Sequence, residues 1–291
     1  MNKRYLAFLS MDNLEGFVSD DELAIAPLQA REWEVHTVSW RQSCDWSRYD
    51  LVVIRTTWDY QNNVNAFLEV LSQIQTSGAV LQNNLNVVKW NIEKTYLQEL
   101  EKKGNSIVQT IWGESLPSIK IFQDYFRHLQ CDELIIKPVV SANADFTYRV
   151  RRENLKTLYP QLQVEYENRP FMIQPFMPNI LSEGEYSLFY FNGEYSHAIL
   201  KTPKKHDFRV QEEHGGLITS VQPESVLKRN GEKVLQSLTE LPLYARVDFV
   251  RNSGAHFEIM EVELIEPALY FRTDAASAER FAAAVDEGSW K

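Results

Sequence analysis

The 291-residue chain has 44% apolar and 24% charged residues, the balance of an ordinary globular protein with room for one large or two to three small domains. Its formal net charge of −10 disfavours nucleic acid as a partner, because phosphate backbones require basic surfaces. Cys44 and Cys131 lack metal-ligand spacing, and no apolar stretch approaches the ~18 residues of a membrane span. We therefore expect a cytoplasmic protein with no nucleic-acid or membrane partner.

The first third of the chain predicts a small parallel sheet with helices on its faces. Strands are predicted over residues 5–10, 34–40, 50–54 and 79–82. Helices are predicted over residues 21–31 and 63–75. The third strand is apolar on both faces, as central parallel strands are. This β-α-β-α-β order indicates an α/β fold, and we assign residues 1–86 to an N-terminal α/β domain.

The remaining two-thirds predict an α+β organisation. A helix over residues 89–103 ends at Gly104, which suits the left-handed conformation that stops a helix. Strand-like segments follow over residues 106–110, 118–121, 133–137, 171–174, 186–191, 196–201, 244–250 and 257–265. Further helices are predicted over residues 224–238 and 275–285. We divide this part into a central subdomain, residues 87–168, and a C-terminal subdomain, residues 169–291.

The strongest local signal is an acidic β-hairpin near the C-terminus. Residues 252–255 have turn chemistry between two alternating runs. A loop with an even number of residues would place Arg246 opposite Glu261. Side chains two apart share a face, so one face would present Arg246, Asp248, Glu261 and Glu263. The core-facing set would be Val247, Phe249, Met260, Val262 and Leu264. A slip of one residue would exchange the two faces.

The acidic face of this hairpin predicts a magnesium site. Three neighbouring carboxylates repel one another and raise one another's pKa values. Mg²⁺ removes that repulsion, and it prefers a few carboxylate oxygens together with phosphate oxygens. The expected ligands are Asp248, Glu261 and Glu263. The alternative is a solvated strand face balanced by Arg246.

Two lysines and one linker suit a nucleotide. Lys94 is expected near the start of its helix, and Lys137 closes an apolar run before Pro138. A buried ammonium is costly unless an anion meets it, and phosphate is a plausible anion. The alternative is a side chain that extends to water. Residues 171–178 form an apolar strand and a proline-bounded linker, which either suits an adenine ring or marks an ordinary strand end.

Residues 201–216 form a polar segment that ends in Gly215 and Gly216. Lysine and arginine contribute four basic side chains to it. This composition suits a mobile loop that closes over an anionic substrate, and the alternative is an ordinary exposed loop.

Taken in order, these segments resemble the ATP-grasp superfamily over essentially the whole chain. The matching elements are the small α/β domain, the helix with Lys94, strand-Lys-Pro at residues 136–138, the linker at 174–177, Arg-x-Asp at 246–248 and Glu-x-Glu at 261–263. D-alanine–D-alanine ligases are similar but have Glu-x-Asn in the last element. The resemblance implies a mixed α/β and α+β fold, with the nucleotide between two α+β subdomains after an N-terminal domain that binds substrate.

A narrower resemblance rests on residues 55–60, 207–211 and 263–267. These segments are similar to the branch that contains the O-ureido-serine cyclo-ligase of cycloserine biosynthesis. Glutathione synthetases and the ligases that add glutamate to ribosomal proteins are more distantly similar.

The resemblance also implies a role for each matching residue. The ATP phosphates would be bound by Lys94 and Lys137. The adenine ring would be framed by Gln174, Phe176 and Met177, and the ribose hydroxyls by Glu185. Two Mg²⁺ ions, for which Mn²⁺ could substitute, would be held by Asp248, Glu261 and Glu263. Arg246 would face an acyl phosphate, and the loop that covers it would include Lys201 and Arg209.

The implied activity is an ATP- and magnesium-dependent carboxylate–amine ligase, a monomer or homodimer that joins a small amino-acid-like acid to a nitrogen nucleophile through an acyl phosphate. Phosphoryl transfer needs mainly positioning and charge neutralisation, so no Ser-His-Asp set is expected. Arg55 follows the third predicted strand, where open α/β sheets bind ligands. We expect Arg55 to meet an anionic substrate group, with Trp58 and Tyr60 shaping the pocket. The alternative makes Arg55 an interdomain ion pair and both aromatic rings core residues.

One segment departs from the superfamily pattern. Residues 141–147, after Lys137, lack the glycines common in its phosphate lid. Two other functions therefore remain open: a non-catalytic or regulatory nucleotide-binding protein, and an ATP-grasp kinase.

Overall fold

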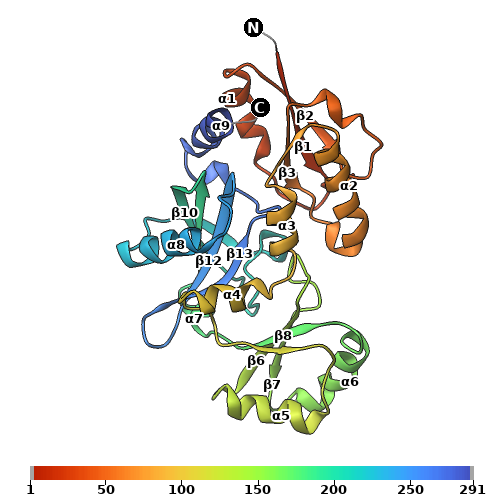
Figure 1. Ribbon diagram of the computed structural model, residues 1–291. Coiled ribbons are helices and arrows are strands. Elements are labelled where there is room, and N and C mark those ends of the chain that lie inside the picture. The colour runs from red at the N-terminus through yellow and green to blue at the C-terminus, as the bar shows by residue number, and fades with distance from the viewer. Residues whose placement is uncertain (1–2, 289–291) are drawn as a thin grey trace.

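The protein is described by a computed structural model over residues 3–288, which contains three β-sheets arranged along its length (Figure 1). The first sheet is parallel, in the order β2-β1-β3-β4. Its strands are β1 (Arg4–Ser10), β2 (Trp33–Ser39), β3 (Leu51–Thr56) and β4 (Val80–Gln82). The helices α1 (Ile25–Gln29) and α2 (Val64–Thr76) pack on opposite faces. Every residue of β3 is buried, as its sequence predicts.

The second sheet is antiparallel, in the order β11-β10-β9-β12-β13. Its strands are β9 (Glu185–Phe191), β10 (Glu194–Thr202), β11 (Leu217–Ser220), β12 (Tyr244–Arg251) and β13 (Phe257–Glu263). One face packs against α4 (Tyr96–Lys102) and α8 (Ser225–Ser237). On the other face, α9 (Ser277–Glu287) packs with α1 against the ends of β9 and β10. The rest of that face bears the charged side chains of the site.

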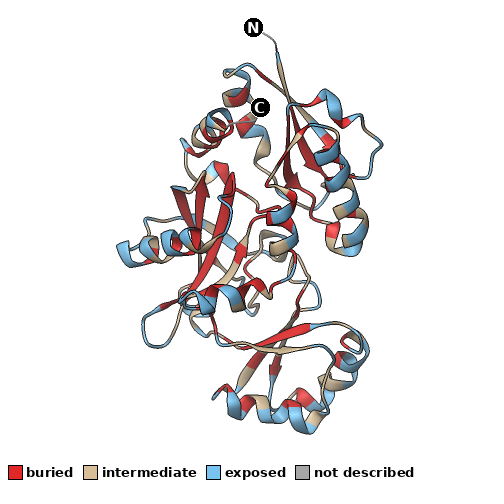
Figure 2. Ribbon diagram, in the orientation of Figure 1, coloured by how far each residue is buried: buried red, intermediate tan, exposed pale blue. Residues whose placement is uncertain are grey.

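The third sheet is also antiparallel, in the order β5-β8-β6-β7. Its strands are β5 (Ile111–Gly113), β6 (Glu133–Pro138), β7 (Tyr148–Arg151) and β8 (Phe171–Pro175). Its outer face packs against α5 (Ile119–His128) and α6 (Leu155–Glu165), through Phe122, Phe126 and Leu162. Figure 2 shows that buried residues concentrate in the strands of all three sheets. The short helix α7 (Asn179–Ser182) links β8 to β9.

The predicted helix over residues 89–103 is interrupted. The structure has α3 (Leu85–Asn91) and α4, and Lys94 lies in the break between them, two residues before α4 begins. There its backbone N–H donates to the carbonyl of Val139, at 2.9 Å. The break therefore attaches this segment to the end of β6, the strand that contains Lys137.

Two other predicted strands are wrong. Residues 106–110 form only a single bridge, between Ile107 and Ile259. Residues 118–121 are the start of α5, whose Phe122 and Phe126 are buried on one face. A four-residue apolar window cannot distinguish a strand from a helix, whereas the i, i+4 spacing over the longer window can.

The acidic hairpin forms, but in a different register. Arg246 lies opposite Glu263 rather than Glu261, and Asp248 lies opposite Glu261. Arg251 pairs with Phe257, so the loop has an odd number of residues, which alone would exchange the two faces. A β-bulge at Asp248–Phe249 leaves Met260 as an extra residue and restores the predicted acidic face. Met260 consequently leaves the predicted core set and lines a cavity.

Candidate active site

A cavity lies between the second and third sheets and is bounded at one end by residues that follow β3. The inner face of the third sheet contributes Ile135, Lys137 and Gln174. The second sheet contributes Glu185, Lys201, Arg246, Glu261 and Glu263. Trp58 and Tyr60 close the N-terminal end. The charged residues predicted from distant parts of the sequence therefore surround one space.

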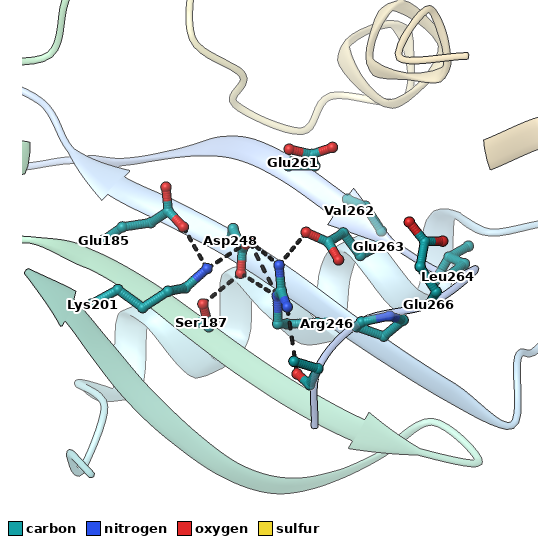
Figure 3. Close-up of polar contacts among 12 residues, drawn as sticks. Glu185, Ser187, Lys201, Arg246, Asp248, Glu261, Val262, Glu263, Leu264 and Glu266 are labelled. Carbon is teal, nitrogen blue, oxygen red and sulfur yellow. Dashed lines mark hydrogen bonds and ion pairs between the residues drawn. The ribbon is translucent and has the colours of Figure 1, made fainter. Parts of the chain in front are cut away.

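The centre of this site is a buried charge network around Asp248 (Figure 3). The Lys201 ammonium lies 3.1 Å from one Asp248 oxygen and 2.7 Å from a Glu185 oxygen. The Arg246 guanidinium lies 3.1 Å from Asp248 and also pairs with Glu263. Lys201 belongs to β10 rather than to the following loop, so its predicted place on a covering loop is wrong.

Hydrogen bonding completes the neutralisation of Asp248. Ser187 donates to its second oxygen at 2.5 Å. Burial alone would raise the pKa of Asp248, but Arg246 and Lys201 outweigh burial and lower it to about 2. Asp248 is therefore ionised at neutral pH, and its charge is fully matched within the protein.

Glu261 and Glu263 differ in their electrostatic surroundings. Burial raises the pKa of Glu261, but Lys94 and Lys137 outweigh it, so the net pKa is lowered. Lys94 lies 3.0 Å from Glu261 and donates to the Ser141 carbonyl at 2.8 Å. Burial, reinforced by Glu261, raises the pKa of Glu263 to about 7 despite Arg246.

Lys137 is half-buried and differs from the buried cations of the site in its partners. Within residues 3–288 its ammonium makes no ion pair or hydrogen bond, although Lys94, Lys201 and Arg246 each have a carboxylate partner. Burial lowers the pKa of Lys137. An ammonium in this position favours an anionic ligand.

Across the part of the chain that the structure describes, no three acidic, histidine or cysteine groups are arranged to hold a metal ion. The predicted ligands Asp248, Glu261 and Glu263 are instead paired with Arg246, Lys201 and Lys94. Glu261 and Glu263 line the cavity. Their carboxylate chemistry fits a cation that draws further oxygens from a phosphate, because Mg²⁺ needs few protein ligands.

The predicted nucleotide linker forms the less polar part of the cavity. Gln174 is buried, and its amide donates to Thr110 Oγ1 at 3.0 Å. Phe176 is contacted by the Arg149 guanidinium 3.7 Å from its ring centroid. Met177 lines the cavity from the linker, and Met260 lines it from the β-bulge. This region offers apolar contacts to a flat ring.

Arg55 occupies the interior rather than the cavity wall. It is 1% exposed, its guanidinium lies 3.0 Å from Asp21, and it donates to the Pro267 carbonyl at 2.9 Å. Trp58 and Tyr60 do line the cavity. The ion pair of Arg55 thus lies within the predicted N-terminal domain, and only its hydrogen bond to Pro267 crosses to the C-terminal part of the chain. The geometry favours a structural role for Arg55 and the pocket for the two aromatic residues.

Two loops meet beside the cavity. In residues 141–147, Asn143, Ala144 and Phe146 have positive φ angles of 54°, 58° and 53°. These non-glycine residues therefore adopt the left-handed conformation that glycine would adopt at lower cost. His214, from the polar loop, approaches the Asn143 carbonyl at 3.3 Å. Arg209 lines the cavity and pairs with Asp207 at 2.9 Å, so the two loops cover the site together.

Met260 and Glu266 are among the residues of the cavity wall that sequence reasoning did not select as site residues. The bulge that exposes Met260 has no signal in the alternation of the strand. Glu266 follows Glu263 by three residues in a segment beyond the hairpin, and its signal was its place in the resemblance over residues 263–267, to which no role was attached.

Comparisons with known proteins agree with this geometry. Residues 6–83 match the model of the N-terminal domain of the D-cycloserine synthetase DcsG. Residues 93–244, half of the chain, match the ATP-grasp domain of prokaryotic glutathione synthetase. The cycloserine biosynthesis protein DcsG of Streptomyces lavendulae is 26% identical over 275 residues, covering 88% of this chain and 87% of that protein.

Solved structures show the same fold. The crystal structure of D-cycloserine synthetase DcsG has a TM-score of 0.85 at 22% identity, covering 99% of this chain and 100% of that one. The ATP-grasp ligase PsnB, complexed with minimal precursor, Mg and ADP, has a TM-score of 0.67 at 13% identity, with 98% and 97% covered. No helix within residues 3–288 is long and apolar enough to cross a membrane.

Proposed function

This chain belongs to the ATP-grasp family and is an ATP-dependent ligase, and we propose that it activates a small amino-acid-like carboxylic acid as an acyl phosphate and transfers it to a nitrogen nucleophile. The observation that best supports this proposal is the ammonium of Lys137, which has no ion-pair or hydrogen-bond partner among residues 3–288, in a cavity where the buried cations Lys94, Lys201 and Arg246 are paired. A triphosphate supplies the missing negative charge.

The nucleotide would lie between the two antiparallel sheets. Lys137 and Lys94 would bind its phosphates together. In the structure Lys94 pairs with Glu261 and donates to the Ser141 carbonyl, and both of these residues also line the cavity. The adenine would contact the linker residues Gln174, Phe176 and Met177, and Met260, which packs against the same apolar cluster as Met177. Glu185 is the candidate for the ribose hydroxyls, although it already pairs with Lys201.

Magnesium would be held by Glu261 and Glu263 at the cavity wall, with Asp248 behind them. We propose two ions, for which Mn²⁺ could substitute. Binding requires these carboxylates to exchange ammonium and guanidinium partners for the metal. The metal, when bound, neutralises phosphate charge; this is the principal chemical requirement of phosphoryl transfer.

The protein residues then position the acid and stabilise developing charge. A carboxylate attacks the γ-phosphoryl group of ATP, ADP leaves, and the nitrogen nucleophile displaces phosphate from the acyl phosphate. Arg246 would face the acyl phosphate, where one such contact contributes about 2.7–4 kcal/mol to the transition state. Arg209 would reach the same group from the covering loop, and Lys201 would hold Asp248 in place.

The experiment is a screen of amino acids for ADP release, with product mass spectrometry. Glu261→Gln should abolish ADP release while the fold, checked by circular dichroism, is retained. Free phosphate and a condensed product are the outcome expected of a ligase. A product that keeps the phosphate would support a kinase, and ATP binding without turnover would support a non-catalytic protein. Unchanged activity of Glu261→Gln would contradict the proposed metal site.

A further inference from the structure

A second ionisable group of the cavity wall has no partner within residues 3–288, and its ionised form carries the charge opposite to that of Lys137. Glu266 is 9% exposed and lines the cavity beyond the end of β13. Its carboxyl group forms no hydrogen bond or ion pair within the described chain, and Figure 3 shows no contact to it. Burying a carboxyl group without a hydrogen-bond partner is unfavourable, and a ligand could supply that partner.

The backbone that holds Glu266 is fixed at every residue. Five consecutive carbonyls accept hydrogen bonds from five side chains of the surrounding elements. Listed in order, they are Ile265 from Tyr244 at 2.8 Å, Glu266 from Trp58 at 2.8 Å, Pro267 from Arg55 at 2.9 Å, Ala268 from Arg246 at 3.4 Å and Leu269 from His197 at 3.0 Å. The segment is irregular but immobilised, so the Glu266 carboxyl is held in a defined place rather than on a flexible loop.

The surroundings of this carboxyl select a cation. Trp58 and Tyr60 line the same end of the cavity, and the indole N–H of Trp58 donates to the backbone carbonyl of Glu266. Aromatic rings beside a carboxylate favour an ammonium group. A substrate carboxylate is disfavoured there, because Glu263 and Glu261 already make the potential negative. Burial and then Glu263 raise the pKa of Glu266 well above its usual value, and Lys94 and Arg246 offset only part of this rise.

We propose that Glu266, with Trp58 and Tyr60, binds the ammonium group of the amino-acid substrate and so positions its carboxylate towards Lys137. This inference rests on the proposed ligase function. Lys137 would then bind the anionic nucleotide, and Glu266 would bind the cationic ammonium group of the acid. Glu266 would thus contact the substrate directly, at its ammonium group rather than at the reacting carboxylate.

The test compares matched acids in an ADP-release assay with ATP and Mg²⁺. The probes are alanine and serine beside propionate and 3-hydroxypropionate, which lack only the amino group. We expect wild-type protein to prefer the amino acids. Glu266→Gln should raise KM for an amino acid on the order of 10- to 100-fold, because a charge-assisted hydrogen bond is lost, with a smaller change in kcat. Its ATP affinity, measured by calorimetry, should stay at the wild-type value.

Glu69→Gln is the control, because Glu69 is exposed on α2, lies outside the cavity lining and makes no hydrogen bond or ion pair within the described chain. It should leave KM unchanged. Equal use of amino acids and deaminated acids, or an unchanged KM in Glu266→Gln, would overturn this inference and leave the ligase function intact. Absence of ADP release with every probe would overturn the inference for these substrates, and lost ATP affinity in Glu266→Gln would show a structural role instead.

Discussion

The two antiparallel sheets that face the cavity differ in how their charges are paired. On the second sheet, Asp248, Lys201 and Arg246 neutralise one another at distances of about 3 Å. On the third sheet, Lys137 has no protein partner within the described chain. A charge matched inside the protein holds the fold together, whereas a charge left unmatched in a cavity is available to a ligand. The paired cations of the second sheet therefore contribute to stability as well as to the proposed binding, whereas Lys137 contributes to binding.

The largest expected effect comes from the matched network. Asp248→Ala leaves the buried cations Lys201 and Arg246 facing each other without their shared carboxylate. We expect the free energy of unfolding to fall by about 3–5 kcal/mol, as measured by urea denaturation. The exposed pair Arg127–Asp124 is the control, and Arg127→Ala should cost less than about 1 kcal/mol. Equal effects of the two variants would erase the distinction between the sheets.

The pH dependence of stability tests the burial of His197, which lies on β10 of the second sheet. His197 stacks on Phe189, its Nε2 donates to the Leu269 carbonyl, and burial lowers its pKa to about 4. The unfolded chain has a histidine pKa near 6.5, so the neutral ring stabilises the fold fully above about pH 6.5. This contribution is lost as the pH falls from about 6.5 to 4, by about 3 kcal/mol.

The measurement is urea unfolding of wild-type protein and His197→Gln across that pH range. Carboxylates titrate in the same range in both proteins, and the difference between the two curves isolates the histidine. Parallel curves would contradict the assigned neutral state.

Substitution of Arg55 tests whether this charge stabilises the fold or binds the substrate. Arg55 pairs with Asp21 and holds the Pro267 carbonyl, so Arg55→Met should reduce the free energy of unfolding by about 2 kcal/mol. Thermal and urea unfolding would measure the loss. A variant with wild-type stability and a strongly raised KM for the acid would instead support the role in substrate binding that the sequence predicts.

Much of the site was accessible from sequence because period-2 alternation specifies which side chains share a strand face. This places Arg246, Asp248, Glu261 and Glu263 together even though the predicted register is wrong. The register could not be read, since an odd loop and a β-bulge compensate each other. The strand with Lys137 was equally clear from its apolar run before proline.

The remaining features depend on contacts between residues far apart in the chain. The partners of Arg55 lie 34 and 212 residues away, and no local pattern reveals them. The break around Lys94 depends on a backbone bond to Val139 at the end of β6. The fixed segment that holds Glu266 likewise depends on side chains from β3's end, β10 and β12. Tertiary packing, rather than propensity, decides these positions.

The central claim is that Lys137 binds the phosphates of the nucleotide, and calorimetry with Lys137→Met tests this claim most directly. ATP with Mg²⁺ should bind the variant at least about 10-fold more weakly than wild-type protein, because one charge-assisted contact is lost. Adenosine, which has no phosphate, should bind both proteins with equal affinity. Equal affinity of both proteins for ATP would contradict the claim.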